Sequence, residues 1–314
     1  MSSRILTVTL NPALDITTTT ARLLPQRKLR CDAPRYDPGG GGINVSRVIK
    51  ELGGESTTFA ALGGRTGLQM KRMLAASGLD VEAWRSRGDT RFSMTVMEEE
   101  TGLHYRFVLP GPEQTVASAD RLLRRLGERA AGGYGFIVGS GSLPPGLPID
   151  FYGRLAEIAR TNGARLILDT HGDALREALP FRPWLIRLNH HEAQELLGGD
   201  EDRAAHELAR ELVQRGSAEI AIVALGERGA FLVSADHSIE IAPPHMEVRS
   251  MVGAGDSFVG ALTLGLSRGW PIDEATRYGV AAAAAAVTTE ATQLCEAATV
   301  ETIFAQMGGR RPVA

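Results

Sequence analysis

The chain has 314 residues, of which 43% are apolar and 23% are charged, a balance that is typical of soluble globular proteins. Its formal net charge of −3 provides no broad basic surface, so we expect no nucleic-acid partner. The first residues lack the apolar core of a signal peptide, and no apolar run is long enough to cross a bilayer. We therefore expect no membrane partner. Because there are only two cysteines and they are far apart in sequence, we also expect a cytoplasmic enzyme with free thiols and no disulfide framework.

An apolar, β-branched stretch at residues 4–10 predicts a buried first strand. Two segments, 12–38 and 90–109, are β-prone and lack a helical period. Because they interrupt a chain that otherwise alternates strand and helix, we expect a small antiparallel sheet that stands off the main domain as a lid. Two hairpins within the main sheet are the alternative. The main domain then comprises residues 1–11, 39–89 and 110–314.

Basic residues in the two lid segments would ordinarily be solvated. If the lid covers a cleft, however, these side chains can converge on an anionic ligand, and arginine matches phosphate geometry with two parallel hydrogen bonds. The candidates are Lys28, Arg30, Arg91 and Arg106.

A run of four glycines, residues 39–42, enters the amphipathic helix pattern INVSRVIKELG. Its spacing differs from a dinucleotide-binding fingerprint, and the chain contains no Walker-type phosphate loop. The bare backbone could let a substrate approach, with Asn44 exchanging hydrogen bonds with hydroxyl groups. A flexible turn before a helix is the alternative.

The later part of the chain alternates regularly between strand and helix. Near-continuous apolar stretches predict strands at residues 136–141, 165–170, 184–189 and 219–226. Helical patterns occur at residues 118–131, 150–162, 172–179, 190–197 and 203–215, and the chain is mostly helical from residue 255 onward. This order predicts an α/β fold, with a doubly wound, mostly parallel sheet and helices on both faces.

The stretch LNHHE, residues 188–192, lies at the end of a predicted strand. Asn189 and Glu192 are three positions apart at a helix start and share a face, and their oxygens suit Mg²⁺, usually through water. His190 and His191 are adjacent on that helix and face different directions, so they make a poor pair of zinc ligands. Magnesium is therefore the metal that this stretch favours.

Two glycine-containing turns follow. The stretch VALGERGAF, residues 223–231, predicts strand, turn and strand, and it could border a nucleotide or form a plain hairpin. Gly253, Ala254 and Gly255 precede a predicted helix, whose first amides have no internal partners and lie at the positive end of the dipole. They could cradle the negative charge that develops on a transferring phosphoryl group.

Asp256 follows this second turn directly. Its carboxylate could accept the proton of an attacking hydroxyl group. The helix N-terminus should keep the carboxylate ionised, which would weaken it as a base. A simple helix-capping role for Asp256 is the alternative.

Together these stretches resemble the ribokinase family of carbohydrate kinases, also called the phosphofructokinase-B family. The C-terminal signature of that family centres on G-A-G-D, found here at residues 253–256. Its N-terminal signature is matched by GGGGINVSRV and its N-x-x-E metal motif by NHHE, in the family's order along the chain. LNPALD, KLRCDAP, YRFVLPG and SGSLPPG are similar to the branch that phosphorylates fructose 6-phosphate.

The resemblance implies a ribokinase-like fold and an ATP- and Mg²⁺-dependent kinase that phosphorylates fructose 6-phosphate at C1 and forms a homodimer through its lid. It implies Asp256 as the catalytic base and the amides of Gly253, Ala254 and Gly255 as the anion hole. Sugar contacts are implied for Asp15, Gly39, Gly40 and Asn44, with Lys28, Arg30, Arg91 and Arg106 around the sugar or its phosphate. The implied Mg²⁺ residues are Asn189 and Glu192, and the nucleotide side comprises Arg187, Asn189, Ala224, Gly226 and Gly229.

Several positions depart from this branch. Arg187 and His191 stand where it carries lysines, and Ala224 stands where it carries serine, which leaves nucleotide preference open. Residues 288–293 lack the Asn and Arg of the branch's cation loop, so dependence on a monovalent cation also stays open.

Other functions remain as alternatives. Fructose-1-phosphate and tagatose-6-phosphate kinases are similar, but they typically carry a lysine in the glycine run, where this chain has Gly40 and Gly41. A more distant alternative is a sugar- or nucleotide-binding protein without catalytic activity.

Overall fold

A computed structural model describes residues 3–198, 203–289 and 293–310. Within these ranges the main sheet has nine strands in the order β13-β12-β11-β10-β9-β8-β1-β4-β5, and all run parallel except β12, which is antiparallel to both β11 and β13. The strands are β1 Arg4–Thr9, β4 Thr57–Leu62, β5 Asp80–Arg85, β8 Tyr134–Ser140, β9 Arg165–Asp169, β10 Leu185–Asn189, β11 Ile220–Ala224, β12 Ala230–Val233 and β13 Ser238–Ile241. The predicted doubly wound α/β fold is confirmed.

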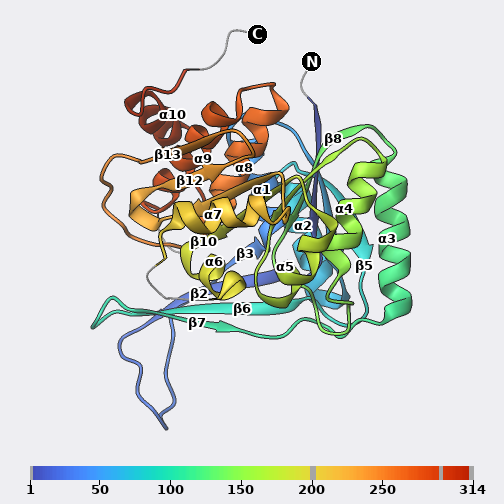
Figure 1. Ribbon diagram of the computed structural model, residues 1–314. Coiled ribbons are helices and arrows are strands. Elements are labelled where there is room, and N and C mark those ends of the chain that lie inside the picture. The colour runs from blue at the N-terminus through green and yellow to red at the C-terminus, as the bar shows by residue number, and fades with distance from the viewer. Residues whose placement is uncertain (1–2, 199–202, 290–292, 311–314) are drawn as a thin grey trace.

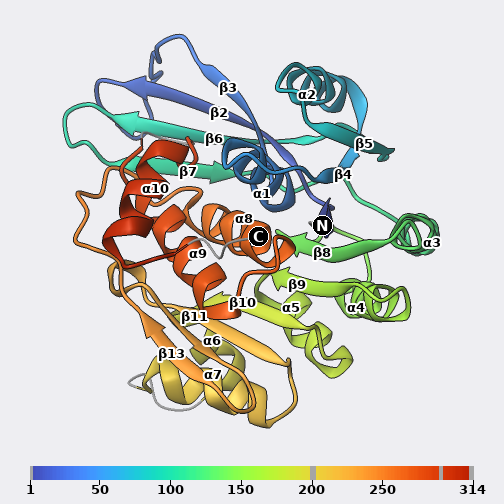
Figure 2. The same ribbon diagram turned by 90° about the horizontal axis from the view of Figure 1, so that it is seen from above.

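Helices cover both faces of this sheet (Figures 1 and 2). One face carries α1 Gly41–Glu51, α2 Gly64–Ala76, α8 Ala254–Ser267, α9 Ile272–Ala286 and α10 Ala297–Gln306. The other carries α3 Val116–Ala130, α4 Phe151–Thr161, α5 Gly172–Ala178, α6 His190–Leu197 and α7 Ala205–Gln214. Two short 3₁₀ turns, η1 Leu179–Phe181 and η2 Gly226–Arg228, join helix to strand and strand to strand.

The two β-prone insertions form a separate second sheet, as predicted, and the alternative of hairpins within the main sheet is wrong. Its strands are β2 Ala13–Thr20, β3 Arg35–Gly39, β6 Arg91–Glu98 and β7 His104–Val108, in the order β3-β2-β6-β7. The central pair, β2 and β6, is parallel, so the expectation of a purely antiparallel sheet is wrong. Both strands follow strands of the parallel main sheet, β1 and β5, and therefore leave it in the same direction.

The predicted strands and helices of the later chain are confirmed to within a few residues. No element is predicted for residues 54–89, where the structure has β4, α2 and β5. Strand β5 lies at the edge of the sheet, and its sequence DVEAWR mixes charged and apolar residues. Such a strand lacks the continuous apolar pattern that identifies the central strands.

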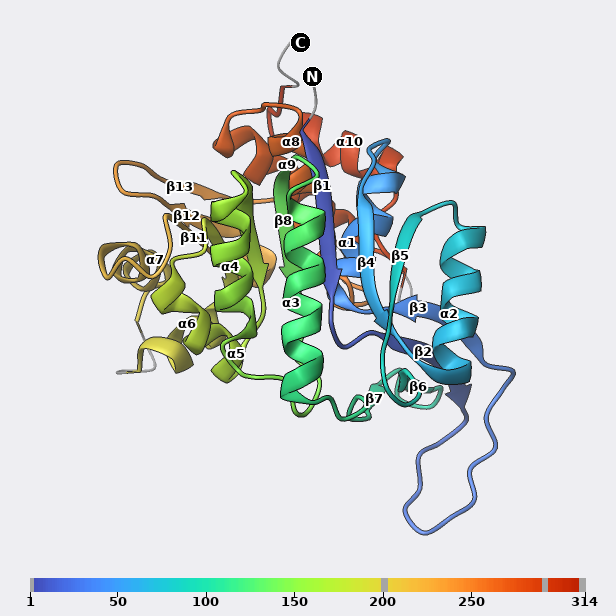
Figure 3. The ribbon, with the colours of Figure 1, turned by 90° about the vertical axis from the view of Figure 1, so that its right-hand side faces the viewer.

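The strand order reverses between β1 and β8. From β1 the chain proceeds to β4 and β5 on one side, and from β8 it proceeds through β9, β10 and β11 on the other. Ligands of open α/β sheets bind outside the carboxyl ends of the strands at such a switch point. The lid stands at this end of the sheet (Figures 1 and 3).

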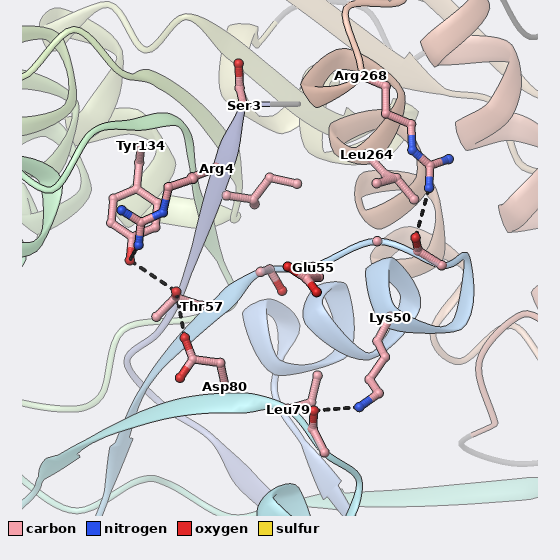
Figure 4. Close-up of a pocket in the computed structure, with 15 residues that line it drawn as sticks. Ser3, Arg4, Lys50, Glu55, Thr57, Leu79, Asp80, Tyr134, Leu264 and Arg268 are labelled. Carbon is pink, nitrogen blue, oxygen red and sulfur yellow. Dashed lines mark hydrogen bonds between the residues drawn. The ribbon is translucent and has the colours of Figure 1, made fainter. Parts of the chain in front are cut away.

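The other end of the sheet, where strands β1, β4 and β5 begin, carries a cavity of about 870 Å³ (Figure 4). Around it, Lys50 donates to the carbonyl oxygen of Gly78 at 2.5 Å and Arg268 donates to that of Gly53 at 3.1 Å. Each cation thus binds carbonyl groups at the C-terminal end of a helix other than its own, where the helix dipole is negative. These contacts fasten helices to one another on the side away from the switch point.

In the described parts of the chain, no helix has both the length and the apolar character that crossing a membrane requires. Cys31 is exposed and Cys295 is buried, and both are free thiols.

Candidate active site

The carboxyl ends of the central strands bring polar side chains together at one end of the sheet. Strand β8 ends at Ser140, β9 at Asp169 and β10 at Asn189. In the parallel ladder Ser140 pairs with Asp169, and Asn189 pairs with Ala224 at the end of β11. Hydroxyl, carboxylate and amide groups from segments that are far apart in sequence therefore lie together at this end of the sheet.

Asp256 lies in the first turn of α8. Gly253 precedes this helix with a φ of 79°, a left-handed conformation that suits glycine, which has no side chain to cap the helix. Because Asp256 lies in the first turn, a role in stabilising the helix start stays an alternative. Its Oδ2 accepts a hydrogen bond of 2.8 Å from Nδ2 of Asn44 in α1, so the two predicted motifs meet.

The partly buried carboxyl group of Asp256 binds its proton unusually tightly. Burial raises its pKa to about 7, and the neighbouring carboxylate of Asp169 adds to the rise. The hydrogen bond from Asn44 and the charges of Arg187 and Arg106 oppose it. Desolvation therefore outweighs the helix dipole, which is worth up to about 2 kcal/mol at a partly buried site, and the carboxyl group titrates near neutral pH although the dipole was expected to keep it ionised.

The glycine run lets α1 begin close to the end of β8. A methyl group on Gly41 would lie 2.1 Å from Oγ of Ser140 and 2.9 Å from its carbonyl carbon, and one on Gly39 would lie 2.1 Å from Oδ2 of Asp15 on the neighbouring lid strand. Gly40 between them has a φ of 121°, which other residues rarely adopt. The fold therefore requires glycine at positions 40 and 41, and the run also leaves backbone groups accessible beside Asn44.

One face of the lid is polar. Asp15 pairs with Ser93 across the lid sheet, and Arg106 pairs with Thr95 two positions further on, so these residues share a face. Burial raises the pKa of Asp15 to about 6, and the charge of Arg106 counters this rise. The charge of Arg106 also lowers the pKa of Asp256, so the polar face of the lid lies within electrostatic reach of the α8 turn.

Arg91 binds the points where the chain crosses between the main domain and the lid. Its Nη2 donates to the carbonyl oxygen of Asn11 at 3.2 Å, and its Nη1 donates to that of Leu109 at 3.2 Å. Asn11 in turn donates to Oγ of Ser142 at 3.1 Å. A phosphate contact by Arg91 would therefore require it to exchange some of these hydrogen bonds.

Lys28 and Arg30 lie on the loop between β2 and β3, which projects from the body of the chain (Figures 1 and 3). Both side chains are exposed. The base of the loop is held to the lid, because Glu98 accepts a hydrogen bond of 2.8 Å from the amide of Leu23. Within one chain, and among the residues described, these two cations lie on the projecting loop and not beside Asp256.

Arg187 in β10 lies against the glycine turn and pairs with Asp169. Its Nη1 is 3.3 Å from Oδ1 of Asp169, and a methyl group on Gly255 would lie 3.0 Å from Nη1. Its Nε is buried and has no hydrogen-bond partner in the described ranges, so a donor remains for an anion. Asp169 is absent from the predicted site, although an acid at the carboxyl end of an apolar strand is a signal that could have identified it.

Asn189 and Glu192 form a reciprocal cap at the start of α6. Oδ1 of Asn189 accepts from the amide of Glu192 at 2.8 Å, and Oε2 of Glu192 accepts from the amide of Asn189 at 2.7 Å. Oε1 of Glu192 makes no hydrogen bond within the described residues, and Mg²⁺ commonly binds one carboxylate together with waters and phosphates. The pair therefore fits this ion.

The two histidines between them have different partners. His190 contacts the carbonyl oxygen of Arg203 at 2.8 Å, and His191 pairs with Glu195 at 3.3 Å. In the described part of the chain, no group of three or more His, Cys, Asp or Glu residues is arranged to hold a metal ion.

The residues predicted to border the nucleotide follow β11 at the same end of the sheet. After Ala224 the chain turns through η2, where Gly226 has a φ of 65° and Gly229 a φ of 92°. A methyl group on Gly229 would lie 2.0 Å from the carbonyl oxygen of Ile241, so the fold requires glycine there. Strands β11 and β12 form a hairpin, and a nucleotide-binding role for this turn stays a prediction. Residues 290–292 of the predicted cation loop lie outside the described ranges.

We expect Asp256→Asn to stabilise the protein at alkaline pH. Because the fold raises the pKa of Asp256 to about 7, the wild type loses stability as the pH rises from about 4 to about 7, and the Asn variant lacks this loss. The gain should be on the order of 1–3 kcal/mol at pH 8 and should shrink towards pH 4. Urea unfolding of both proteins across this range measures it. A variant less stable than wild type at pH 8 would contradict the expectation.

Comparisons with known proteins agree with this geometry. The sequence profile of the pfkB family carbohydrate kinases matches residues 8–299. The ATP-dependent 6-phosphofructokinase isozyme 2 of Mycobacterium tuberculosis strain H37Rv is 44% identical over 303 residues, which cover 96% of this chain and 89% of that protein. Crystal structures of phosphofructokinase-2 from Escherichia coli match with TM-scores of 0.90 (in complex with fructose-6-phosphate) and 0.93 (in complex with potassium), at 36% and 37% identity. Both matches cover 98% of this chain and 99% of the other. The chain therefore belongs to the pfkB family of carbohydrate kinases and is a phosphotransferase.

Proposed function

We propose that this protein is an ATP-dependent kinase that phosphorylates fructose 6-phosphate at its C1 hydroxyl, giving fructose 1,6-bisphosphate. The main support is Asp256, a partly buried carboxyl group at the start of α8 that lies within reach of the charge of Arg106 on the polar face of the lid. The names of the relatives support this acceptor. Kinases for fructose 1-phosphate or tagatose 6-phosphate remain alternatives, and a binding protein without turnover is a more distant one.

In the proposed reaction Asp256 accepts the proton of the C1 hydroxyl as its oxygen attacks the γ-phosphorus of ATP. The bond between the β- and γ-phosphates breaks, and ADP leaves with its electron pair. A base whose pKa lies near the working pH combines a useful ionised fraction with useful proton affinity. The pKa of about 7 that burial gives to Asp256 suits this role.

The start of α8 supplies the proposed anion hole. The amides of Gly253, Ala254 and Gly255 have no partners further back in the helix, and the two glycines leave the backbone open to a bulky group. In a loose phosphoryl-transfer transition state, negative charge is spread over the phosphoryl oxygens. Arg187, which lies against Gly255, adds positive charge beside the same atoms.

The sugar phosphate lies between the glycine run and the lid in this proposal. Asp15, Asn44 and the backbone of Gly39 and Gly40 hold the hydroxyl groups. The phosphate group of the sugar is held by the basic residues of the two lid segments, Lys28, Arg30, Arg91 and Arg106. For Lys28 and Arg30 this requires movement of their projecting loop, or its supply by a second copy of the chain.

The nucleotide lies along the ends of β10 and β11, beside Arg187, Ala224, Gly226 and Gly229. Asn189 and Glu192 would hold Mg²⁺, which when bound offsets the charge of the phosphate groups. We further propose that segments 12–38 and 90–109 close as one lid over both substrates. Closure excludes water, which would otherwise compete with the sugar for the phosphoryl group.

An acceptor screen tests the function directly. With MgATP, the purified protein should release ADP much faster with fructose 6-phosphate than with fructose 1-phosphate, tagatose 6-phosphate or fructose. Asp256→Asn should lower kcat by roughly 10²–10⁴, the usual contribution of a positioned acid or base. Preference for another sugar phosphate would transfer the assignment to that alternative, and no turnover with any acceptor would favour a binding protein.

Replacement of Arg106 tests the placement of the sugar phosphate. Arg106→Ala should raise KM for the sugar phosphate by about 10- to 100-fold, the effect of a lost charged hydrogen bond, and leave KM for ATP nearly unchanged. Arg22→Ala is the matched control, because Arg22 is also a lid arginine but pairs with Glu100 at the exposed end. Equal rises in both KM values would show that Arg106 acts on the fold of the lid and not on the sugar phosphate.

The face of the lid opposite the polar one is apolar and exposed. Tyr36, Ile16, Met94 and Phe107 align across the four strands, so they share this face. Tyr36, Met94 and Phe107 are 42%, 37% and 46% exposed. An apolar sheet face of this kind suits contact between identical surfaces, and we propose that two copies of the chain associate through it.

Phe107→Asp should convert this homodimer to a monomer, because each subunit would place a charge in an apolar contact. Sedimentation velocity measures the change. Ile149→Asp is the matched control, since Ile149 is 54% exposed just before α4, a helix that covers the main sheet, and this variant should remain dimeric. A wild type that sediments as a monomer at micromolar concentration would overturn the proposal.

A further inference from the structure

Arg47 in α1 contacts the residue that holds Asp256. Its Nη1 donates to Oδ1 of Asn44 at 3.2 Å and to the carbonyl oxygen of Pro38 at 3.2 Å. Nδ2 of Asn44 donates to Oδ2 of Asp256 at 2.8 Å. Asn44 and Arg47 are three residues apart in the helix, so their side chains lie on one face. Two hydrogen bonds thus connect the guanidinium to the carboxylate through one amide.

The chemistry of this connection permits one orientation of the Asn44 amide. A guanidinium group only donates hydrogen bonds, an ionised carboxylate only accepts them, and an amide has one end of each kind. With Arg47 on one side and Asp256 on the other, the amide oxygen must face Arg47 and the nitrogen must face Asp256. Without a donor at position 47, the amide is free to turn its oxygen towards the carboxylate, where the two would repel each other.

We propose that Arg47 is a positioning residue for phosphoryl transfer, which orients the Asn44 amide so that this amide holds the Asp256 carboxylate in place. The inference rests on the proposed role of Asp256 as the base. The hydrogen bond to Pro38 joins the same guanidinium to lid strand β3. Asn44 is therefore oriented with respect to both the lid and the start of α8.

A packing role alone does not account for an arginine at this position. Arg47 is partly buried, and burial lowers the pKa of its guanidinium group, which shows that desolvation opposes the charge. The carboxylates of Asp37, Asp15 and Asp256 counter this effect. An apolar side chain of similar length would fill the space without that desolvation cost. The charge and the donors of Arg47 are thus used for the groups that it contacts.

The groups that face Asp256 come from four parts of the fold. Asn44 and Arg47 belong to α1, and Asp169, Arg187 and Arg106 belong to β9, β10 and the lid. Arg47 and the hydrogen bond from Asn44 favour the ionised carboxylate. Loss of Arg47 should therefore raise the pH below which a base at Asp256 is inactivated.

Arg47→Met tests the inference. We expect kcat with fructose 6-phosphate to fall by about 10- to 100-fold, KM for MgATP to change by less than about twofold, and the acid limb of the kcat/KM profile to move to higher pH. Arg47→Lys keeps the charge without the planar fork, so it should restore the acid limb but only part of kcat. Lys50→Met is the control and should keep wild-type kcat. Lys50 lies in the last turn of the same helix, where it donates to the carbonyl oxygen of Gly78, far from Asp256.

A double-mutant cycle separates orientation from other effects of Arg47. If Arg47 acts through Asn44, then Arg47→Met should have little further effect on kcat in an Asn44→Ala background. Additive effects would overturn the inference, because they would mean that Arg47 acts on the sugar or the lid independently. If circular dichroism shows that Arg47→Met does not fold, the same cycle is measured with Arg47→Lys.

The outcomes distinguish this inference from the proposed function. A wild type without turnover on fructose 6-phosphate, or an Asp256→Asn variant as active as wild type, would remove the function on which the inference rests. If both tests of that function succeed while Arg47→Met keeps the wild-type kcat and pH profile, only the role of Arg47 fails.

Discussion

The hydrogen bond between Asn44 and Asp256 joins the first turns of two helices whose residues are 212 positions apart in sequence. It depends on close packing of α1 and α8, because a methyl group on Gly260 would lie 2.6 Å from Cγ1 of Val48. With the helices in contact, the glycine run and the G-A-G-D turn reach the same point of the sheet edge. That point is where the strand order reverses, and the other polar groups are arranged around it.

The candidate site contains two carboxyl groups, of Asp256 and Asp15, that burial makes costly to ionise. The pKa values of Asp256 and Asp15 rise to about 7 and about 6, although arginines face both groups. A folded chain gains no stability from this arrangement near neutral pH, since the raised values favour the protonated forms. Polar groups that weaken the fold while remaining accessible are typical of sites selected for binding and chemistry.

The lid uses the two-residue period of its strands for two purposes. Asp15 and Arg106 lie on the polar face, while the alternate residues Ile16 and Phe107 form an apolar outer face. Any association through the outer face would therefore affect the strands that carry the polar face. Arg91 binds carbonyl groups at two of the four places where the chain crosses between the main domain and the lid, so the lid is held there.

The sequence alone determined the family, the fold class, the existence of the lid and the candidate residue Asp256. Strand and helix periods are local properties, and the family motifs keep their order along the chain. The tertiary structure decided what depends on distances between remote segments: that Asp169 stands beside Arg187, that Asn44 contacts Asp256, and that the central lid strands are parallel. It also decided the direction of the pKa shift at Asp256, because burial is a property of the folded chain and outweighs the local helix dipole that the sequence reveals.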